Sequence, residues 1–159
     1  MPQPGVLSMT RIDFYFNAPD KLDIAIKLAR KAYAKKHRLT IYTRDADRLS
    51  ALDRLMWTSP PTGFLPHCAA GHKLAPQTAI LLSDDAVAES ASMPHHEILM
   101  NLDQEQPAHF SRFERVLEIV SRDDGEDRRQ ARERLKFYRD RGYEIGTVDL
   151  DTLKERDSA

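Results

Sequence analysis

The chain has 159 residues, of which 41% are hydrophobic and 31% charged, so it is long enough for one domain with its own core and is not disordered overall. Its 24 Lys and Arg balance 25 Asp and Glu, for a net charge of -1, which excludes a global attraction to nucleic acid and leaves only local charge-driven binding. The single cysteine, Cys68, excludes an internal disulfide and favours the reducing cytoplasm. No apolar run reaches the roughly 18 residues of a membrane span, and no signal core follows the start.

The first half of the chain predicts strands alternating with helices. Residues 1–8 hold two prolines and a glycine without periodicity and are expected to form a disordered lead-in. Short apolar runs and helical spacing then predict, in order, a strand over 11–16, a helix over 20–36, a strand over 38–43 and a helix over 45–57. This βαβα opening is typical of a parallel sheet.

The second half predicts a proline-stiffened loop followed by more strands and helices. The predicted elements are a loop over 58–66, strands over 79–83 and 97–102 with a loop between them, a helix over 108–121, a helix over 126–141 closed by Gly142, a strand over 143–150 and a polar tail over 151–159. The whole predicts one domain over 9–150. Its fold class is α/β, three-layer, with a mostly parallel sheet and helices on both faces.

The residues that catalysis would require are missing from this pattern. After the first strand the chain reads Asn17-Ala18-Pro19-Asp20, without the glycines that cradle a pyrophosphate in Rossmann-like folds. No glycine-flanked nucleophile and no paired metal-binding acids occur. The nearest metal candidates are His67, Cys68 and His72, with His95 and His96 later in the chain, and their spacing lacks the pairs of a zinc motif. We therefore expect no enzyme activity, no metal and no cofactor.

The last predicted helix carries a stripe of cations beside one apolar residue. With Arg128 set to zero and about 100° added per residue, Arg139 falls near 20°, Arg132 near 40°, Lys136 near 80° and Leu135 near 340°. No acid lies on this stripe. Exposed cations beside an apolar side chain suit a ligand with acidic and hydrophobic parts, such as an acidic peptide ending in a large side chain and a free carboxylate.

A second interpretation of the stripe remains open. By the same count Ala131 and Tyr138 mark the core side of the helix, near 300° and 280°. The stripe then borders packed structure, and it can equally be a solvated face with local ion pairs. The pairs that this interpretation expects are Arg129 with Glu133 and Lys136 with Asp140.

A second candidate surface follows the helix over 45–57. Trp57 ends this helix. Phe64 and Leu65 follow in a loop that contains three prolines and one glycine. Large apolar side chains in an exposed, rigid loop are typical of a protein contact. The alternative is that these side chains fold back into the local core.

Several of these segments resemble the DNA polymerase III chi subunit family. The resemblance runs in order from about Met9 to Leu150 and rests on Phe14-Tyr15-Phe16, Ala51-Leu52-Asp53-Arg54-Leu55-Met56-Trp57, Phe64-Leu65-Pro66-His67, Ile98-Leu99-Met100-Asn101-Leu102, Phe113-Glu114-Arg115-Val116, Ala131-Arg132-Glu133-Arg134, Tyr138-Arg139 and Gly142-Tyr143. It assigns the block that begins at Phe113 to the family's penultimate helix.

The resemblance implies a non-catalytic accessory subunit with two protein partners. One is the acidic C-terminal tail of single-stranded DNA-binding protein, which the family binds at positions matching Arg128, Arg132, Leu135 and Lys136. The other is the psi subunit of the clamp loader, whose contact maps around Trp57, Phe64 and Leu65. Leu135 stands where the family commonly has an aromatic residue, so a looser apolar grip is implied. DNA would be reached only indirectly, and no membrane is involved.

Two other functions compete with this one. A nucleotide-binding or nucleotide-hydrolysing α/β enzyme with an unusual phosphate loop is the first, because fold alone does not settle function. The second is direct binding of single-stranded DNA by the arginine-rich helix, with Tyr138 and Tyr143 stacking on bases. These tyrosines are expected to face inward, which disfavours the second alternative.

Overall fold

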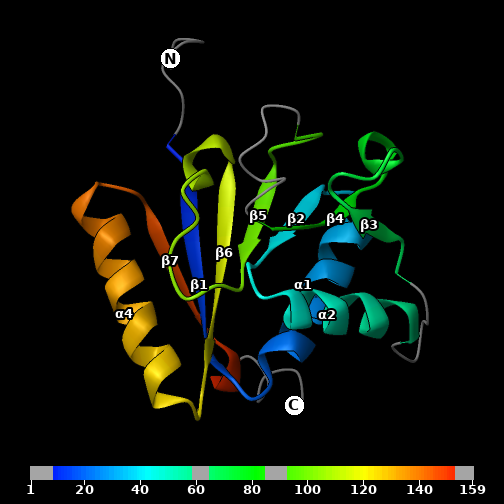
Figure 1. Cartoon of the computed structure of the whole chain (residues 1–159). Coiled ribbons are helices and arrows are strands. Elements are labelled where there is room, and N and C mark those ends of the chain that lie inside the picture. Colours follow the sequence, from blue (N-terminus) through cyan, green and yellow to red (C-terminus); the bar gives the residue numbers. More distant parts are fainter. Residues whose placement is uncertain (1–8, 59–64, 85–92, 153–159) are drawn as a thin grey trace.

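A single parallel sheet organises the protein. The computed structural model describes residues 9–58, 65–84 and 93–152. Their strands pair in the order β3-β4-β2-β5-β6-β1-β7, and every pairing is parallel. Helices lie on both sides of the sheet (Figure 1), so the three-layer α/β fold predicted from the sequence is confirmed. The predicted lead-in over 1–8 and most of the predicted tail lie outside the described residues.

The elements follow the predicted order closely. The strands are β1 (Arg11–Ala18), β2 (Leu39–Tyr42), β3 (His67–Ala69), β4 (Ile80–Ser83), β5 (Ile98–Asn101), β6 (Arg115–Ser121) and β7 (Ile145–Asp149). The helices are α1 (Lys21–Ala34), α2 (Ala46–Thr58) and α4 (Gly125–Asp140), with short 3-10 turns η1 (Ala75–Gln77) and η2 (Phe110–Arg112). None of the helices in the described ranges combines the length and apolar character that crossing a membrane requires.

The core has two halves, one on each face of the sheet. On one face α1 and α2 contribute Ala25, Ala29, Leu52 and Met56 and pack on strand residues such as Ile41. On the other face α4 and η2 contribute Ala131, Tyr138 and Phe110 and pack on Phe14 and Val116. Successive strand residues point to opposite faces, and the strands therefore supply apolar side chains to both halves.

Side-chain caps fix where α1 and α4 begin. The Asp20 carboxylate accepts hydrogen bonds from the N–H groups of Leu22 and Asp23, and Asp124 caps α4 in the same way. Asp at this position satisfies backbone donors that have no partner within the helix. Gly142 follows α4 with a φ of 83°, which confirms the left-handed residue predicted there.

The helix predicted over 108–121 is wrong, and with it the assignment of Phe113-Glu114-Arg115-Val116 to a helix. This segment forms η2 and then β6, whose residues Val116 to Val120 are all buried. A strand that is covered on both faces shows no alternation, so apolar residues spaced by three and four imitated a helix. The β-branched Val116, Ile119 and Val120 were the better guide. The edge strand β3, three residues long, was not predicted either. It lies between the predicted loop over 58–66 and the predicted strand over 79–83.

A buried histidine precedes β5. His95 is only 7% exposed. Burial lowers the pKa of His95 to about 4, and the nearby Arg38 cation lowers it further, because both effects disfavour the charged imidazolium. His95 is therefore neutral in the folded protein at neutral pH.

We expect His95 to make stability depend on pH. The unfolded chain takes up a proton near pH 6.5 and the folded chain only near pH 4, so the folded state loses stability as the pH falls through this window. The loss should reach up to about 3 kcal/mol. Urea unfolding at pH 7 and pH 4.5 should show a smaller loss in His95→Gln than in the natural protein. An equal loss in both proteins would contradict this assignment.

Candidate functional site

Helix α4 exposes the cationic stripe predicted from the sequence. Its buried side is formed by Ala131, Arg134 and Tyr138, each at most 2% exposed, in agreement with the core side expected from the helical count. On the opposite flank Arg128, Arg132, Lys136 and Arg139 are exposed, while Leu135 is half-buried against the core. The structure thus brings the four predicted residues Arg128, Arg132, Leu135 and Lys136 onto one edge of α4, which lies alone over its part of the sheet (Figure 1).

The ion pairs on α4 do not involve Arg132 or Lys136. Arg129 lies outside the stripe and binds Glu126 at 2.5 Å and Glu133 at 2.8 Å, so the expected pair of Arg129 with Glu133 is confirmed. Within the described part of the chain, Arg132 and Lys136 form no ion pair. The expected pair of Lys136 with Asp140 is also absent there, and Asp140 instead lies 4.0 Å from Arg139.

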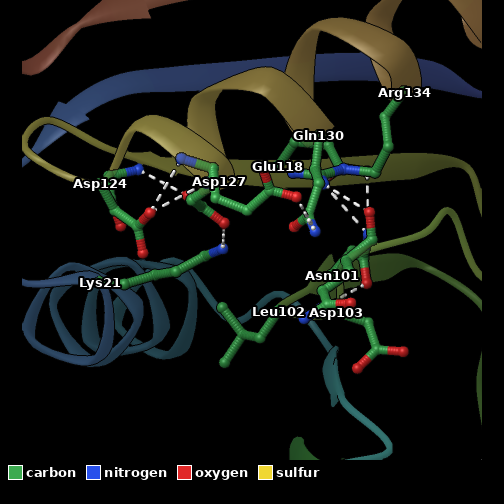
Figure 2. A network of polar contacts seen from close by, with 12 residues as sticks. Lys21, Asn101, Leu102, Asp103, Glu118, Asp124, Asp127, Gln130 and Arg134 are labelled. Atoms are coloured by element: carbon green, nitrogen blue, oxygen red, sulfur yellow. Dashed lines mark hydrogen bonds and ion pairs between the residues drawn. The ribbon is translucent and has the colours of Figure 1, made fainter.

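A buried ionic network beneath α4 holds the helix in place (Figure 2). Glu118 of β6 is fully buried, and Arg134 is 2% exposed. The Arg134 Nε donates to Glu118 Oε1 at 2.9 Å, and the Tyr138 hydroxyl donates to Oε2 at 2.7 Å. Asn101 donates to the same carboxylate at 3.0 Å, and the Arg134 Nη1 donates to the Gln104 carbonyl at 2.7 Å. The carboxylate thus receives several donors, which offsets the cost of removing its charge from water.

This network was not predicted from the sequence, although the helical count places one of its members, Arg134, on the core side. Arg134 falls near 240° on the same scale, on the core side beside Ala131 and Tyr138. An arginine on the buried side of a helix needs an acidic partner. Glu118 lies between four apolar neighbours in the segment misassigned as a helix, so that partner was not recognised.

A second ion pair ties the start of α4 to the start of α1. Lys21 Nζ lies 2.8 Å from Asp127 Oδ1, and the Ser121 N–H donates to Asp127 Oδ2 at 2.8 Å. Burial lowers the pKa of Lys21, which the hydrogen bond to Asp127 only partly offsets. Burial raises the pKa of Asp127, but the hydrogen bonds from Lys21 and Ser121 outweigh it, so this pKa is lowered overall. The lowered pKa of Asp127 favours its ionised form, which suits the contact with Lys21.

This pair occupies the position where parallel α/β sheets usually bind nucleotides. The strands β1 and β6 are neighbours, and the helices that follow them cover opposite faces of the sheet, so their carboxyl ends form a topological switch point. Lys21 and Asp127 meet there, and the backbone N–H groups at both helix N-termini already donate to the carboxylates of Asp20 and Asp124. A phosphate group would meet these carboxylates, so the geometry gives no support to the nucleotide-binding alternative.

The second predicted surface lies at the end of α2. Trp57 is 57% exposed and its ring packs edge-to-face on His67. Leu65 is only 3% exposed and belongs to the core, so it offers little area to a partner. Phe64 lies outside the described residues.

The histidines near this surface have local partners. The ring nitrogens of His67 lie 2.7 Å from Asp53 Oδ1 and 2.6 Å from the Leu65 carbonyl oxygen. His72 accepts a hydrogen bond from the Leu74 N–H. Across the described ranges, no three His, Cys, Asp or Glu side chains converge in a way that could hold a metal ion.

Fold and topology define a parallel α/β protein with a cationic helix edge and a separate exposed tryptophan. The family model described as DNA polymerase III chi subunit, HolC, matches residues 9–146. Two proteins named DNA polymerase III subunit chi are also similar. The one from Pseudomonas aeruginosa is 30% identical over 141 residues, covering 86% of this chain and 94% of its own. The one from Haemophilus influenzae is 27% identical over 128 residues, covering 80% and 86%.

The chain therefore belongs to the DNA polymerase III chi subunit family. This membership connects it with DNA replication as a subunit of that polymerase. It confirms the family resemblance found in the sequence.

We expect the buried network to be a major source of stability. Replacing Arg134 by Met should lower the free energy of unfolding by about 3 kcal/mol, because it leaves the Glu118 charge buried without its cation. Arg132→Met, an exposed change on the same helix, should alter it by no more than about 0.5 kcal/mol. Denaturant unfolding measures both.

A double mutant separates this pair from general damage to the helix. Adding Glu118→Gln to Arg134→Met removes the uncompensated charge, so the double variant should lose less stability than the sum of the two single losses. Strictly additive losses would show that the two side chains do not stabilise one another.

Proposed function

We propose that this protein is a non-catalytic accessory subunit of the DNA polymerase III holoenzyme that binds the acidic C-terminal tail of single-stranded DNA-binding protein and links it to the clamp loader through psi. The observation that carries the first part is the edge of α4. Arg128, Arg132 and Lys136 are exposed there around the half-buried Leu135, and Arg132 and Lys136 lack ion pairs within the described ranges.

The chemistry of this edge fits an acidic peptide with a free terminal carboxylate. A guanidinium holds a carboxylate by two parallel hydrogen bonds, which gives Arg132 and Arg128 directional contacts with acidic groups. Leu135 offers an apolar contact for the last large side chain of such a peptide. Each exposed charge contact is expected to contribute about 1 kcal/mol, and several together can give micromolar binding, roughly -8 kcal/mol. Binding of this kind weakens as salt is added.

The network beneath α4 supports this proposal because it fixes the binding edge before the peptide arrives. Glu118 anchors both Arg134 and Tyr138 on the buried side, so the opposite edge does not rotate freely. A preformed edge loses less entropy on binding than a mobile one.

The psi contact is proposed at Trp57. Its ring is exposed, and large aromatic rings of this kind often dominate protein interfaces. Helix α2 packs beside β4, while α4 packs against β6 on the other face. The two surfaces therefore lie on different faces and different parts of the sheet, which leaves room for both partners at once. The proposal also places the protein in the cytoplasm, in keeping with its single cysteine.

We expect Arg132→Ala to weaken tail binding about fivefold, because one charged contact of roughly 1 kcal/mol is lost. Fluorescence anisotropy of a labelled tail peptide from the host's single-stranded DNA-binding protein measures the change. Arg129→Ala is the matched control, since it removes the same charge from the same helix at a side chain already neutralised by Glu126 and Glu133.

Two further results bear on the assignment. Blocking the terminal carboxylate of the peptide as an amide should remove most of the binding. Equal affinity of the natural protein and Arg132→Ala, with both folded by thermal unfolding, would falsify the placement of the tail on α4.

At the second surface, Trp57→Ala should reduce affinity for the host's psi subunit by more than tenfold, as expected for an exposed aromatic anchor. Leu74→Ala is the control, because Leu74 is another exposed large apolar residue, 51% exposed, outside this surface. Calorimetric titration with psi measures both variants, and tail binding should be unchanged in each. A normal psi affinity in Trp57→Ala would move the contact elsewhere.

A further inference from the structure

The segment from Ile24 to Arg44 contains no acidic residue, although acids and bases balance over the whole chain. Its seven Lys and Arg residues are Lys27, Arg30, Lys31, Lys35, Lys36, Arg38 and Arg44. This is a stronger local separation of charge than the α4 stripe shows, since α4 carries acids on its other faces. The near-zero net charge of the whole chain conceals this segment.

Several of these cations gather at the C-terminal end of α1. Lys31, Lys35 and Lys36 are exposed, and within the described residues none of them forms an ion pair. A lysine in the last turn of a helix, or at its C-cap, stabilises the negative end of the helix, which accounts for Lys31 and for the C-cap Lys35. That effect does not account for Lys36 and Arg38, which follow the helix.

One side of this helix end is a small depression rimmed by cations. Its volume is about 120 Å³, and Lys31, Lys35 and Arg115 line it above an apolar floor that includes Leu28. The guanidinium of Arg115 is held in place by hydrogen bonds to Asp13 at 2.7 Å and to the hydroxyl of Tyr15 at 3.3 Å. Although Asp13 partly neutralises it, this oriented guanidinium shares the depression with two exposed lysines, and such a group of cations can contact one phosphate.

The other side combines cations with an exposed aromatic ring. A broader, shallow depression of about 590 Å³ is lined by Tyr33, Lys36, Arg38 and Gln77, among others. Tyr33 is 43% exposed. An exposed ring on which a base can stack, beside cations that contact the backbone, is the combination that single-stranded nucleic acid requires.

This combination is absent from the described part of α4. Tyr138 of α4 is fully buried, and Tyr143, which follows the helix, is half-buried against the core, in agreement with the inward orientation expected from the sequence. The end of α1 lies in the half of the core on the opposite face of the sheet from α4. A ligand at α1 therefore does not compete with a peptide at α4.

We propose that the C-terminal end of α1 is a second binding site, which takes single-stranded DNA without sequence preference. Lys31, Lys35, Lys36 and Arg115 contact phosphates on the two sides of the helix end, and Tyr33 stacks on a base. The site is independent of tail binding, and it adds a direct contact with DNA where the family resemblance implies only an indirect one.

Fluorescence anisotropy of a labelled oligothymidine of about 15 nucleotides, titrated with the full chain, tests the site. Four phosphate contacts predict a loss of affinity of about 50-fold between 50 and 200 mM salt. A duplex of the same length should bind more weakly, since its bases are not free to stack on Tyr33. No saturable binding of the oligothymidine at low salt would overturn the proposal.

Three variants locate the binding. Lys35→Glu and Lys36→Glu should each weaken oligothymidine binding about tenfold, and Tyr33→Ala should weaken it by a similar factor while leaving the weaker duplex binding unchanged. Arg112→Glu is the matched control. It makes the same change of charge at an exposed residue of η2, outside both proposed sites, and should alter affinity less than twofold.

Each contrary pattern has a distinct meaning. An equal loss with Arg112→Glu would show that only the overall charge matters, and an unaffected Tyr33→Ala with equal duplex affinity would remove the preference for single strands; either result overturns the proposal. Loss of tail-peptide affinity, but not of oligothymidine affinity, in Lys36→Glu would assign the surface to the peptide. Failure of tail binding in the natural protein would refute the proposed function and leave this site standing.

Discussion

The architecture around α4 depends on one buried pair, Glu118 with Arg134. Few apolar residues of this helix reach the core, so apolar contact alone does not fix its orientation. The pair does so, because a rotation of α4 by one residue, about 100°, would take Arg134 away from Glu118 and leave this carboxylate buried without its cation, at a cost of several kcal/mol. The exposure of Arg132 and Lys136 follows from this constraint, since the buried face decides which side chains are left outside.

The carboxyl ends of β1 and β6 show a different use of polar groups, which are taken up by contacts within the protein. Its polar groups are engaged where an α/β enzyme would keep them available: Asp127 is used by Lys21 and Ser121, and the helix N-termini are capped by aspartates. Exposed cations without an ion pair in the described ranges include Arg132 and Lys136 on α4 and Lys35 and Lys36 at the end of α1. Because these two groups lie on opposite faces of the sheet, ligands at the two proposed sites would not compete for space.

Most of the fold could be predicted from the sequence, because periodicity reports which side of an element is buried. Periodicity gave the correct element for α1, α2 and α4, which each have one solvent-exposed face. It failed for β6, because both faces of this strand are covered and no alternation remains. On α4 the rotation of about 100° per residue located Arg128, Arg132, Leu135 and Lys136 on one edge. It could not identify Glu118 as the partner of Arg134, because this partner depends on which strand lies beneath the helix. The depressions beside α1 needed Arg115 and Gln77, which only the tertiary structure brings to Lys35 and Tyr33.

The all-parallel sheet also gives the molecule two ends that carry different charged groups. Every strand begins at one edge and ends at the other, and the cap carboxylates of Asp20, Asp45 and Asp124 lie beyond the ends, whereas Lys31, Lys35, Lys36 and Arg115 lie near the starts. The two ends of the strands therefore display different groups to an approaching ligand. A ligand that binds the lysines at the end of α1 meets the strand starts and leaves the capped helix N-termini at the other end of the sheet uncovered.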